Sequence, residues 1–385
     1  MIPPGSTIGI LGGGQLGRML AVPIRQMGYG VAVLAPLGDA PALGLADHAI
    51  RASFDDLDAA RRLAEFSDVV TYEFENVPAA TARAVAERRP LHPSARLLEL
   101  TQDRNREHDF LAGLGIATAP GREVHTVGEF DAALVALGMP ARLKSALGGY
   151  DGGGQLRVHD AASASAARAR IPTVEGGWRL EAEVPFEREL SVIVARSGQE
   201  LRAYAPFENQ HQEGILHLTR WPARGSPRAL TRALEIAEAV AVAGDLCGVM
   251  CVEMFVGGDE VSVNELAPRV HNSGHLTIEG AAVSQFEQHV RAICGLPLGS
   301  PECRVGGVAM ANVLGNVDRR HVRLGGAAAL LAEPGVHLHL YGKDRERPRR
   351  KMGHVTALGV DADDAAARAL RAAANLSFMG ADRAE

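Results

Sequence analysis

The chain has 385 residues, a formal net charge of −6 and a composition that is 46% hydrophobic. This length is enough for two or three domains with full cores, and the negative charge argues against a nucleic-acid partner. We find no signal-type leader and no apolar run near the roughly 20 residues that a membrane-spanning helix needs. The four cysteines lack zinc-type pairing or a disulfide framework, so we expect free thiols in a cytoplasmic protein.

The N-terminal segment predicts a Rossmann-like α/β unit with a parallel sheet. In chain order the pattern predicts a strand at Thr7–Leu11, a helix at Arg18–Met27, a strand at Val31–Leu34, a helix at Leu57–Glu65 and a strand at Asp68–Tyr72. Apolar strands that alternate with amphipathic helices are typical of βαβ units, in which the strands run parallel.

A glycine-rich turn follows the first strand. Gly12, Gly14 and Gly17 have the dinucleotide-binding spacing, which taken alone favours a nicotinamide enzyme. That fingerprint also expects an acidic residue at the tip of the second strand, where this chain has Ala35 and Pro36. The dinucleotide interpretation is therefore weakened. A backbone cradle for an anionic or polar ligand group at a helix N-terminus remains as the prediction.

The middle of the chain predicts a helix, a glycine-rich loop and antiparallel strands. The expected elements are a helix at Leu97–Leu114, strands near Ala141–Lys144, at Trp178–Val184 and at Glu189–Arg196, and a helix at Arg228–Gly244. Four glycines lie among residues 149–155, close after Lys144. Backbone this rich in glycine can fold over phosphates and move as a lid, although the spacing is not that of a P-loop.

The most informative pattern is a hairpin that carries two carboxylates. Apolar strands at Val249–Val256 and Val261–Leu266 flank a glycine turn and contain Glu253 and Glu265. A three-residue loop would set these two residues opposite each other, whereas a two-residue loop would set Asn264 opposite Glu253. Opposed carboxylates at a semi-buried site need a compensating cation, and a hard divalent ion bound to phosphate is the simplest one. A solvated polar hairpin is the alternative, and the polar residues up to His275 argue against it.

The last part of the chain predicts a small α+β unit. After Pro297 we expect strands at Val308–Val313, Val336–Tyr341 and His354–Val360, followed by a helix at Asp363–Leu376. A basic cluster between residues 345 and 351 precedes the last strand, and solvated surface charge is its simplest interpretation.

Several of these motifs together resemble one family. The runs at residues 12–18, 72–76, 149–152, 209–215 and 264–275 closely resemble the N5-carboxyaminoimidazole ribonucleotide synthetases of purine biosynthesis, which are ATP-grasp ligases. The resemblance extends from Ile8 to about His354, and the ending from His271 to His275 is its most discriminating part. It implies a fold of mixed α/β and α+β class. A Rossmann-like domain at 1–96 would precede an ATP-grasp domain at 97–298, with a lid at about 120–180 and a C-terminal domain at 299–385.

The resemblance also implies roles for individual residues. On the ATP side it assigns Arg104 and Lys144 to the phosphates; Gly149, Tyr150, Asp151, Gly152, Gly153, Gly154 and Gln155 to the lid; Glu181, Ala182, Glu183 and Val184 to adenine; Glu189 to the ribose; His211 to the nucleotide; and Glu253 and Glu265, helped by Asn264, to Mg²⁺ or Mn²⁺. On the substrate side it assigns Gln15, Leu16 and Glu73 to aminoimidazole ribonucleotide, Lys343 and Arg350 to its 5′-phosphate, and Asp151, Arg269 and His271 to catalysis.

Two positions depart from the family pattern. Gly153 replaces a usual lysine or arginine of the lid, and Arg349 replaces a glycine in the basic cluster. The first departure removes one cation from the lid. The second leaves open the local backbone conformation and which arginine reaches the phosphate.

The expected activity is ATP-dependent carboxylation of aminoimidazole ribonucleotide by bicarbonate through carboxyphosphate. The alternative within the superfamily is a formate-dependent transformylase related to glycinamide ribonucleotide chemistry. From other classes, an NAD-dependent dehydrogenase or a silent nucleotide-binding module would fit the glycine turn alone. We expect small-molecule partners, a homodimer, and neither a nucleic-acid nor a membrane partner.

Overall fold

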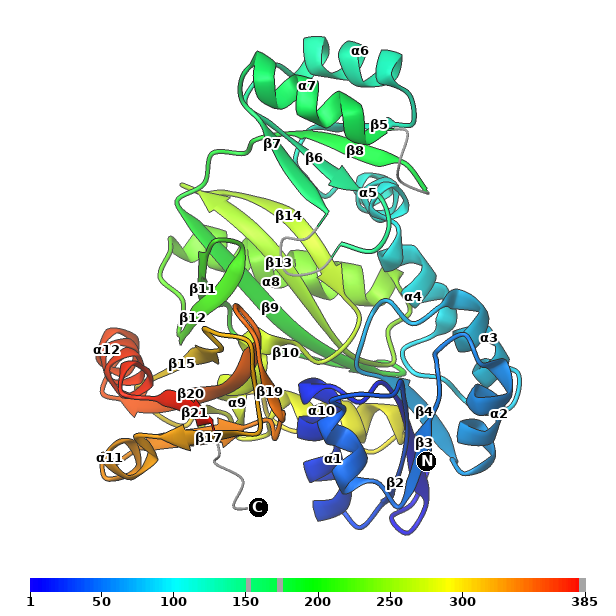
Figure 1. Cartoon of the computed structure of the whole chain (residues 1–385), viewed down its shortest axis with the longest axis vertical. Helices are drawn as coiled ribbons and strands as arrows, with labels where there is room; N and C mark the ends of the chain where they lie inside the picture. The colour runs from blue at the N-terminus through cyan, green and yellow to red at the C-terminus, as the bar shows by residue number, and fades with distance from the viewer. Residues whose placement is uncertain (150–153, 172–175, 381–385) are drawn as a thin grey trace.

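The computed structural model describes residues 1–149, 154–171 and 176–380. Figure 1 shows an N-terminal unit in blue, a small sheet with two helices at the top, and a central sheet whose lower part carries the C-terminal strands. Among the described residues, every helix is too short or too polar to cross a bilayer.

The N-terminal unit is a parallel four-stranded sheet in the order β3-β2-β1-β4. Its elements are β1 (Thr7–Leu11), α1 (Gln15–Gln26), β2 (Gly30–Ala35), the 3₁₀ helix η1 (Pro41–Leu45), β3 (His48–Arg51), α2 (Leu57–Glu65), β4 (Val69–Tyr72) and α3 (Ala79–Ala86). Helix α1 packs on one face and α2 and α3 on the other, so the strands are buried on both sides. The predicted βαβ opening is confirmed. The carboxyl ends of β1 and β4 lie side by side, with Leu11 opposite Tyr72.

The single helix predicted at Leu97–Leu114 is wrong, because this segment forms two helices. Helix α4 (Ala95–Gln102) ends at Asp103, whose backbone is extended, and α5 (Arg104–Gly113) begins at the next residue. The Asp103 side chain accepts hydrogen bonds from the amides of Asn105 and Arg106 and so caps α5. The break places Arg104 at the start of a new helix, beside the central cleft.

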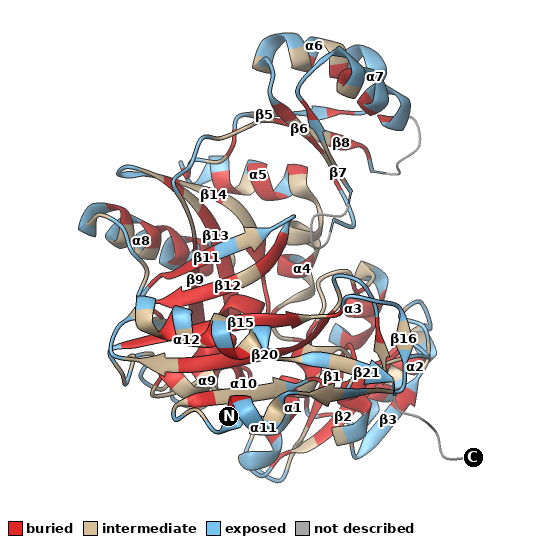
Figure 2. Cartoon of the chain, turned by 60° about the vertical axis from the view of Figure 1, so that its left-hand side comes forward, coloured by how far each residue is buried: buried red, intermediate tan, exposed pale blue. Residues whose placement is uncertain are grey.

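A small antiparallel sheet lies above the centre of the molecule. Its order is β5 (Gly121–Val124), β8 (Trp178–Ala182), β6 (Ala141–Ser145) and β7 (Gln155–Val158). Helices α6 (Val127–Leu137) and α7 (Ala161–Arg170) pack against it through a separate apolar cluster. In Figure 2 the outer surfaces of these helices are exposed, whereas the strands of the central sheet are largely buried.

The central sheet has the order β14-β13-β9-β11-β12-β15-β20-β18, and β10 pairs with β9. Its strands are β9 (Arg188–Ser197), β10 (Glu200–Ala203), β11 (Phe207–Gln212), β12 (Ile215–Trp221), β13 (Gly248–Gly257), β14 (Glu260–Ala267), β15 (Gly307–Leu314), β18 (Val336–Leu340) and β20 (Lys351–Gly359). Pairing of β12 with β15 joins the C-terminal strands to the strands of the middle region in one continuous sheet. The C-terminal part is therefore attached through a hydrogen-bonded ladder as well as through side-chain packing.

Helices and short ribbons complete the fold. They are α8 (Pro227–Ala243), the 3₁₀ helix η3 (Asn272–Leu276), α9 (Thr277–Gly280), α10 (Gln285–Ile293), α11 (Ala327–Leu331) and α12 (Ala362–Ala374), with the ribbon pairs β16 (Arg319–Arg320) and β19 (Arg345–Glu346), and β17 (Val322–Gly325) and β21 (Ser377–Gly380). One apolar cluster contains side chains from the N-terminal unit, the central sheet and the C-terminal strands, so these three parts share a core.

The predicted carboxylate hairpin is formed by β13 and β14. Gly257 pairs with Glu260, which leaves a two-residue turn. A bulge at Asn264 then adds one residue to β14, so Glu253 lies directly opposite Glu265. The sequence left open a two-residue loop and a three-residue loop. The observed turn is the two-residue one, but the bulge sets Glu253 opposite Glu265, which is the pairing expected from the three-residue loop.

Candidate active site

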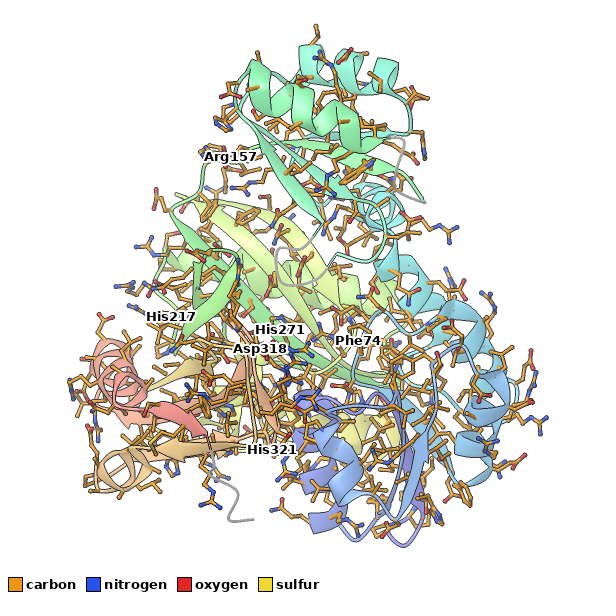
Figure 3. All side chains as sticks on the ribbon, in the orientation of Figure 1. Phe74, Arg157, His217, His271, Asp318 and His321 are labelled. Atoms are coloured by element: carbon orange, nitrogen blue, oxygen red, sulfur yellow. The ribbon has the colours of Figure 1, made fainter. Side chains whose placement is uncertain are left out.

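A cleft of about 420 Å³ opens where the N-terminal unit, the small sheet and the central sheet meet. Figure 3 shows His271 near the middle of the molecule. The predicted residues that line the cleft are Gln15, Leu16, Arg104, Lys144, Gly149, Gly154, Gln155, Glu189, His211, Glu253, Asn264, Glu265, Arg269 and His271. The remaining lid predictions, Tyr150, Asp151, Gly152 and Gly153, lie outside the described residues.

Glu253 and Glu265 form an acidic pair on the floor of this cleft. Glu253 is buried, and burial raises the pKa of its carboxyl, with a further increase from the facing Glu265. Asn264, in the bulge between them and the turn, adds an amide oxygen to the same wall. Two carboxylates and an amide are the oxygen donors that Mg²⁺ prefers, and a bound cation would relieve the repulsion. This donor set therefore fits the predicted metal.

A cationic group faces the acidic pair. Lys144 lies with its Nζ atom 2.6 Å from Glu181, and Arg104 lies 3.6 Å from Glu265 and 4.0 Å from Glu181. Burial alone would raise the pKa of Glu181, but a hydrogen bond from His108 and the charges of Lys144 and Arg104 lower this pKa to about 2. The Glu181 side chain thus holds both cations in place between the small sheet and the hairpin.

A second, more apolar cleft adjoins the first beneath the small sheet. It is lined by the predicted adenine segment from Glu181 to Val184, and the rings of Phe186 and Phe255 stack beside it with centroids 4.6 Å apart. The amides of Ala182 and Glu183 donate to the carbonyls of Pro120 and Pro140. This slot is lined by apolar rings and by the backbone of the segment, both of which can contact a flat heterocycle.

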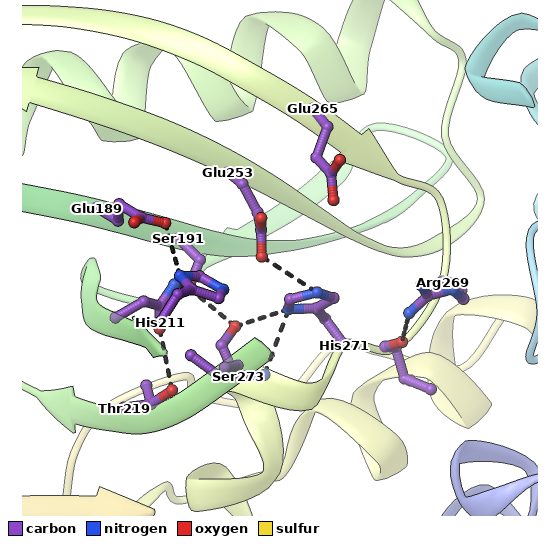
Figure 4. A network of polar contacts seen from close by, with 12 residues as sticks. Glu189, Ser191, His211, Thr219, Glu253, Glu265, Arg269, His271 and Ser273 are labelled. Atoms are coloured by element: carbon purple, nitrogen blue, oxygen red, sulfur yellow. Dashed lines mark hydrogen bonds and ion pairs between the residues drawn. The ribbon is translucent and has the colours of Figure 1, made fainter. Parts of the chain in front are cut away.

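His271 belongs to a chain of hydrogen bonds that runs behind the cleft (Figure 4). Thr219 donates to Asn209, Asn209 donates to Ser191, and Ser191 donates to Ser273, over 3.0, 3.0 and 2.8 Å. The Ser273 amide donates to Nδ1 of His271, and the Ser273 hydroxyl lies 2.9 Å from the same nitrogen.

This chain fixes the tautomer of the imidazole. Burial, together with the charge of Arg269, lowers the pKa of His271 well below its ordinary value, so the ring is neutral. Because Nδ1 accepts a hydrogen bond, Nε2 carries the proton and points at Glu253, 3.2 Å away. On the same wall, Nδ1 of His211 pairs with Glu189 at 2.6 Å, and this pair faces the cleft.

Arg269 is held by a residue of the N-terminal unit. Its guanidinium makes a two-point contact with Glu75, which follows β4, and Nη2 lies 2.7 Å from one carboxylate oxygen. Arg269 is 5% exposed, and the contact neutralises its buried charge. The charge of Arg269 lowers the pKa of Glu75 against the opposing effect of burial. The pair joins the end of β4 to the loop after β14.

The glycine turn does not offer an empty anion cradle, and that prediction is corrected. Glu73, at the end of β4, accepts hydrogen bonds from the amides of Gly14 and Gly17 at 2.8 and 3.1 Å. A Cβ atom added at Gly12 or Gly14 would meet this side chain within 3.0 Å. The protein's own carboxylate thus occupies the helix N-terminus, and Glu73 shapes the turn instead of lining the cleft with Gln15.

The two cations predicted to bind phosphate lie close to Gln15. Lys343 donates to Gln15 at 2.7 Å and to the Lys351 carbonyl at 2.6 Å, while Arg350 pairs with Asp39 at 2.7 Å. Burial, and then the charge of Arg350, lower the pKa of Lys343 to about 7. An anion bound between them would reverse this effect.

Arg349 adopts the left-handed backbone conformation that glycine prefers, with φ of 68°. Its guanidinium donates to the carbonyl of Glu213, at the tip of the hairpin between β11 and β12. Arg350 is therefore the arginine that lies beside Lys343, and Arg349 points to the hairpin that carries His211.

Three domain families match consecutive parts of the chain. The ribonucleotide synthetase preATP-grasp domain matches residues 5–102, the ATP-grasp domain matches residues 109–286, and the phosphoribosylaminoimidazole carboxylase C-terminal domain matches residues 308–368. A Brucella melitensis protein named N5-carboxyaminoimidazole ribonucleotide synthase is 44% identical over 360 residues, which cover 93% of this chain and 97% of that protein. The chain belongs to the N5-carboxyaminoimidazole ribonucleotide synthase family.

Other members of this synthase family are similar over comparable lengths. The Bacillus subtilis protein of the same name is 41% identical over 366 residues, covering 94% of each chain. A crystal structure of the Thermus thermophilus synthetase has a TM-score of 0.86 at 41% identity and covers 97% of this chain and all of that one. An Aspergillus clavatus synthase, crystallised with ADP and aminoimidazole ribonucleotide, has a TM-score of 0.86 at 32% identity, with 96% and 98% of the chains covered. The predicted ATP-grasp fold is confirmed.

The sequence analysis missed several charged residues that line the cleft, among them Glu75, Glu107 and Lys351. Glu75 holds Arg269, Lys351 lines the cleft, and the buried Glu107 accepts a hydrogen bond from the amide of Leu266 next to Glu265. Glu75 had a signal, since it follows the carboxyl end of a parallel strand, where ligand sites form. Glu107 had none, because the helix that carries it was expected to continue through Asp103.

Proposed function

We propose that the chain catalyses the ATP-dependent carboxylation of aminoimidazole ribonucleotide by bicarbonate, giving N5-carboxyaminoimidazole ribonucleotide, ADP and phosphate in purine biosynthesis. The observation that carries the proposal is the opposition of Glu253 and Glu265 in one cleft with Arg269 and His271. The names of the relatives favour this reaction over the formate-dependent alternative.

ATP would lie between the small sheet and the carboxylate hairpin. The apolar slot suits adenine, which the carbonyl of Ala182 and the amide of Val184 would read, while Glu189 would bind the ribose. Lys144 and Arg104 would contact the phosphates. Mg²⁺, held by Glu253, Glu265 and Asn264, would neutralise the phosphate charge that develops during transfer, and Mn²⁺ has the same ligand preference.

The chemistry would proceed in two stages beside Arg269. An oxygen of bicarbonate attacks the γ-phosphorus, the bond to the β-phosphate oxygen breaks, and carboxyphosphate and ADP form. Carboxyphosphate then breaks down to carbon dioxide and phosphate, and the exocyclic amine of the ribonucleotide attacks the carbon dioxide and loses a proton. Arg269, fixed by Glu75, is suited to orient bicarbonate, and the Nε2 proton of His271 can donate to an anionic oxygen. Asp151 stays the predicted proton acceptor.

The ribonucleotide would bind between α1 and the basic cluster. Gln15 and Leu16 line the cleft there, and Gln15 contacts Lys343 directly. A 5′-phosphate between Lys343 and Arg350 would meet a compact ammonium and a planar guanidinium. Glu73 would support this site through the glycine turn.

Other parts of the proposal rest on the family and on the sequence. The domain boundaries at residues 96 and 298, the homodimer and the cytoplasmic location stay predictions. Small molecules are the proposed partners: ATP, bicarbonate and aminoimidazole ribonucleotide.

The decisive experiment is an ADP-release assay with ATP and Mg²⁺. ADP formation should require bicarbonate, increase with aminoimidazole ribonucleotide, and be accompanied by incorporation of labelled bicarbonate into the product. Formate should not replace bicarbonate. ADP release that depends on formate and glycinamide ribonucleotide, or none under any of these conditions, would reject the proposal.

A further inference from the structure

A thiol lies directly behind the acidic pair. Cys251 precedes Glu253 by two residues on β13, so both side chains lie on the same face of the strand. The Cys251 side chain is fully buried, whereas Glu253 and His271 line the cleft in front of it. None of the roles proposed for the reaction uses this thiol.

The three side chains form a compact set of metal-ligating atoms. Cys251, Glu253 and His271 each offer one ligand atom, and these three atoms all lie within 4.8 Å of one another. A tetrahedral zinc ion, with bonds of about 2.0–2.3 Å, holds neighbouring ligands roughly 3.3–3.8 Å apart. Small side-chain movements therefore suffice to bring the three atoms to bonding distance, and the cleft side is open for a water as the fourth ligand.

The surroundings supply the second layer that such a site needs. Ser273 lies 2.9 Å from Nδ1 of His271 and also hydrogen-bonds the Cys251 side chain. With a metal on Nε2, the ring proton would lie on Nδ1 and be donated to the Ser273 hydroxyl, in place of the hydrogen bond that Nδ1 otherwise accepts from the Ser273 amide, and that hydroxyl could donate to the thiolate sulfur. Ser191 holds Ser273 in place from β9. A partner that fixes both ligands is typical of real metal sites.

We propose that Cys251, Glu253 and His271 form an inhibitory site for a thiophilic divalent cation such as Zn²⁺ or Cd²⁺. Mg²⁺ disfavours sulfur, whereas thiolate, imidazole and carboxylate together suit zinc. Binding releases the thiol proton to solvent, while the single proton of the neutral imidazole moves from Nε2 to Nδ1, so that the ring binds the ion as a neutral ligand. The ion occupies Glu253 and His271, so it blocks the Mg²⁺ site and displaces the imidazole donor at once.

Cadmium titration of the full chain, without nucleotide or Mg²⁺, tests binding directly through the thiolate-to-cadmium absorption band. Wild type should bind one equivalent that Cys251→Ala lacks, and Cys251→Ser should bind weakly. Cys303→Ala is the matched control, because this half-buried thiol hydrogen-bonds the Val305 carbonyl and does not line the cleft. An unchanged band and affinity in Cys251→Ala would overturn the proposal. Thermal unfolding checks that each variant is folded.

Zinc inhibition of ADP release tests the consequence. Cys251→Ala should keep the Mg²⁺-dependent activity but need at least about tenfold more Zn²⁺ for half inhibition, since even outer partners of a metal site change affinity by 10- to 100-fold. Equal inhibition of both proteins would show that zinc acts elsewhere. The cadmium titration requires no turnover, so it succeeds or fails independently of the proposed reaction.

Discussion

The hairpin end of the cleft and the region beside Gln15 carry opposite electrostatic imbalances. At the hairpin end, Glu253 faces Glu265, and burial with this repulsion raises the pKa of Glu253. Beside Gln15, outside the residues that line the cleft, Lys343 is half-buried near Arg350, and its pKa falls to about 7. Each region is suited to an ion of the opposite sign. The acidic pair suits a divalent cation, and Lys343 with Arg350 suits a phosphate. Glu73 differs in position, because two backbone amides donate to its carboxylate and it does not line the cleft, although burial raises its pKa as well.

The largest expected effect comes from removing a charge at the hairpin end. Glu265→Gln should lower ADP release by roughly 10²–10³-fold, because the phosphoryl group loses a preorganised charge contact during transfer. Glu260→Gln, an exposed carboxylate on the same strand, is the matched control and should stay close to wild type. Steady-state kinetics with saturating ATP measure the difference. Equal activity of the two variants would show that the carboxylate hairpin takes no part in the reaction.

Beside Gln15, Lys343→Ala should raise the Michaelis constant for aminoimidazole ribonucleotide by roughly 10- to 100-fold, which corresponds to the loss of one charged hydrogen bond. In wild type the constant should rise with pH, because Lys343 loses its proton as the pH passes its pKa of about 7. The variant should lose that dependence, and Lys343→Arg should restore binding without it. Arg347→Ala, in the same cluster but exposed, is the control. A Michaelis constant unchanged in Lys343→Ala would reject the phosphate site.

The contact between Glu75 of the N-terminal unit and Arg269 of the cleft can be tested by changing Glu75. Glu75→Gln should lower kcat by about tenfold while the Michaelis constant for ATP stays constant, because Arg269 loses its two-point contact and with it the orientation proposed for binding bicarbonate. Glu99→Gln breaks a comparable pair with Arg83 on the outer surface and should have no effect. A change confined to ATP affinity would assign Arg269 to the nucleotide instead.

The sequence pattern predicted the acidic pair better than it predicted the contacts that support the cleft. Glu253 and Glu265 lie on one hairpin, so local pattern and spacing were sufficient to place them. Glu73 and the glycine turn are far apart in the chain, and their contact depends on β1 and β4 being neighbours in the sheet. The end of α4 at Asp103 could have been read as a capping signal, but apolar periodicity on both sides concealed it.

Without a bound metal, the acidic pair should lower the stability of the folded protein. Because the folded-state pKa of Glu253 is raised, the folded protein holds this proton more tightly than the unfolded chain does, and stability is lost as the pH rises through the folded-state pKa. Glu253→Gln has no proton to lose. It should therefore be more stable than wild type by about 1–2 kcal/mol at about pH 8, and the difference should shrink toward about pH 5. Urea unfolding in the presence of a chelator measures this, and a variant less stable at both pH values would contradict it.

The smallest expected effect concerns Arg349, where two consequences of one residue must be separated. Its left-handed backbone costs about 1 kcal/mol in any residue with a Cβ atom, while its hydrogen bond to Glu213 contributes roughly 0.5–1.5 kcal/mol in the opposite direction. Arg349→Ala loses the bond and keeps the strain, whereas Arg349→Gly loses both. The glycine variant should thus be more stable than the alanine variant by about 1 kcal/mol and close to wild type.

Chemical unfolding of wild type and the two variants measures this difference. Equal stability of the two variants would mean that the loop relaxes and removes the backbone strain. If the hydrogen bond from Arg349 to Glu213 also positions His211, the alanine and glycine variants should show the same small change in ATP affinity, since both lack the guanidinium.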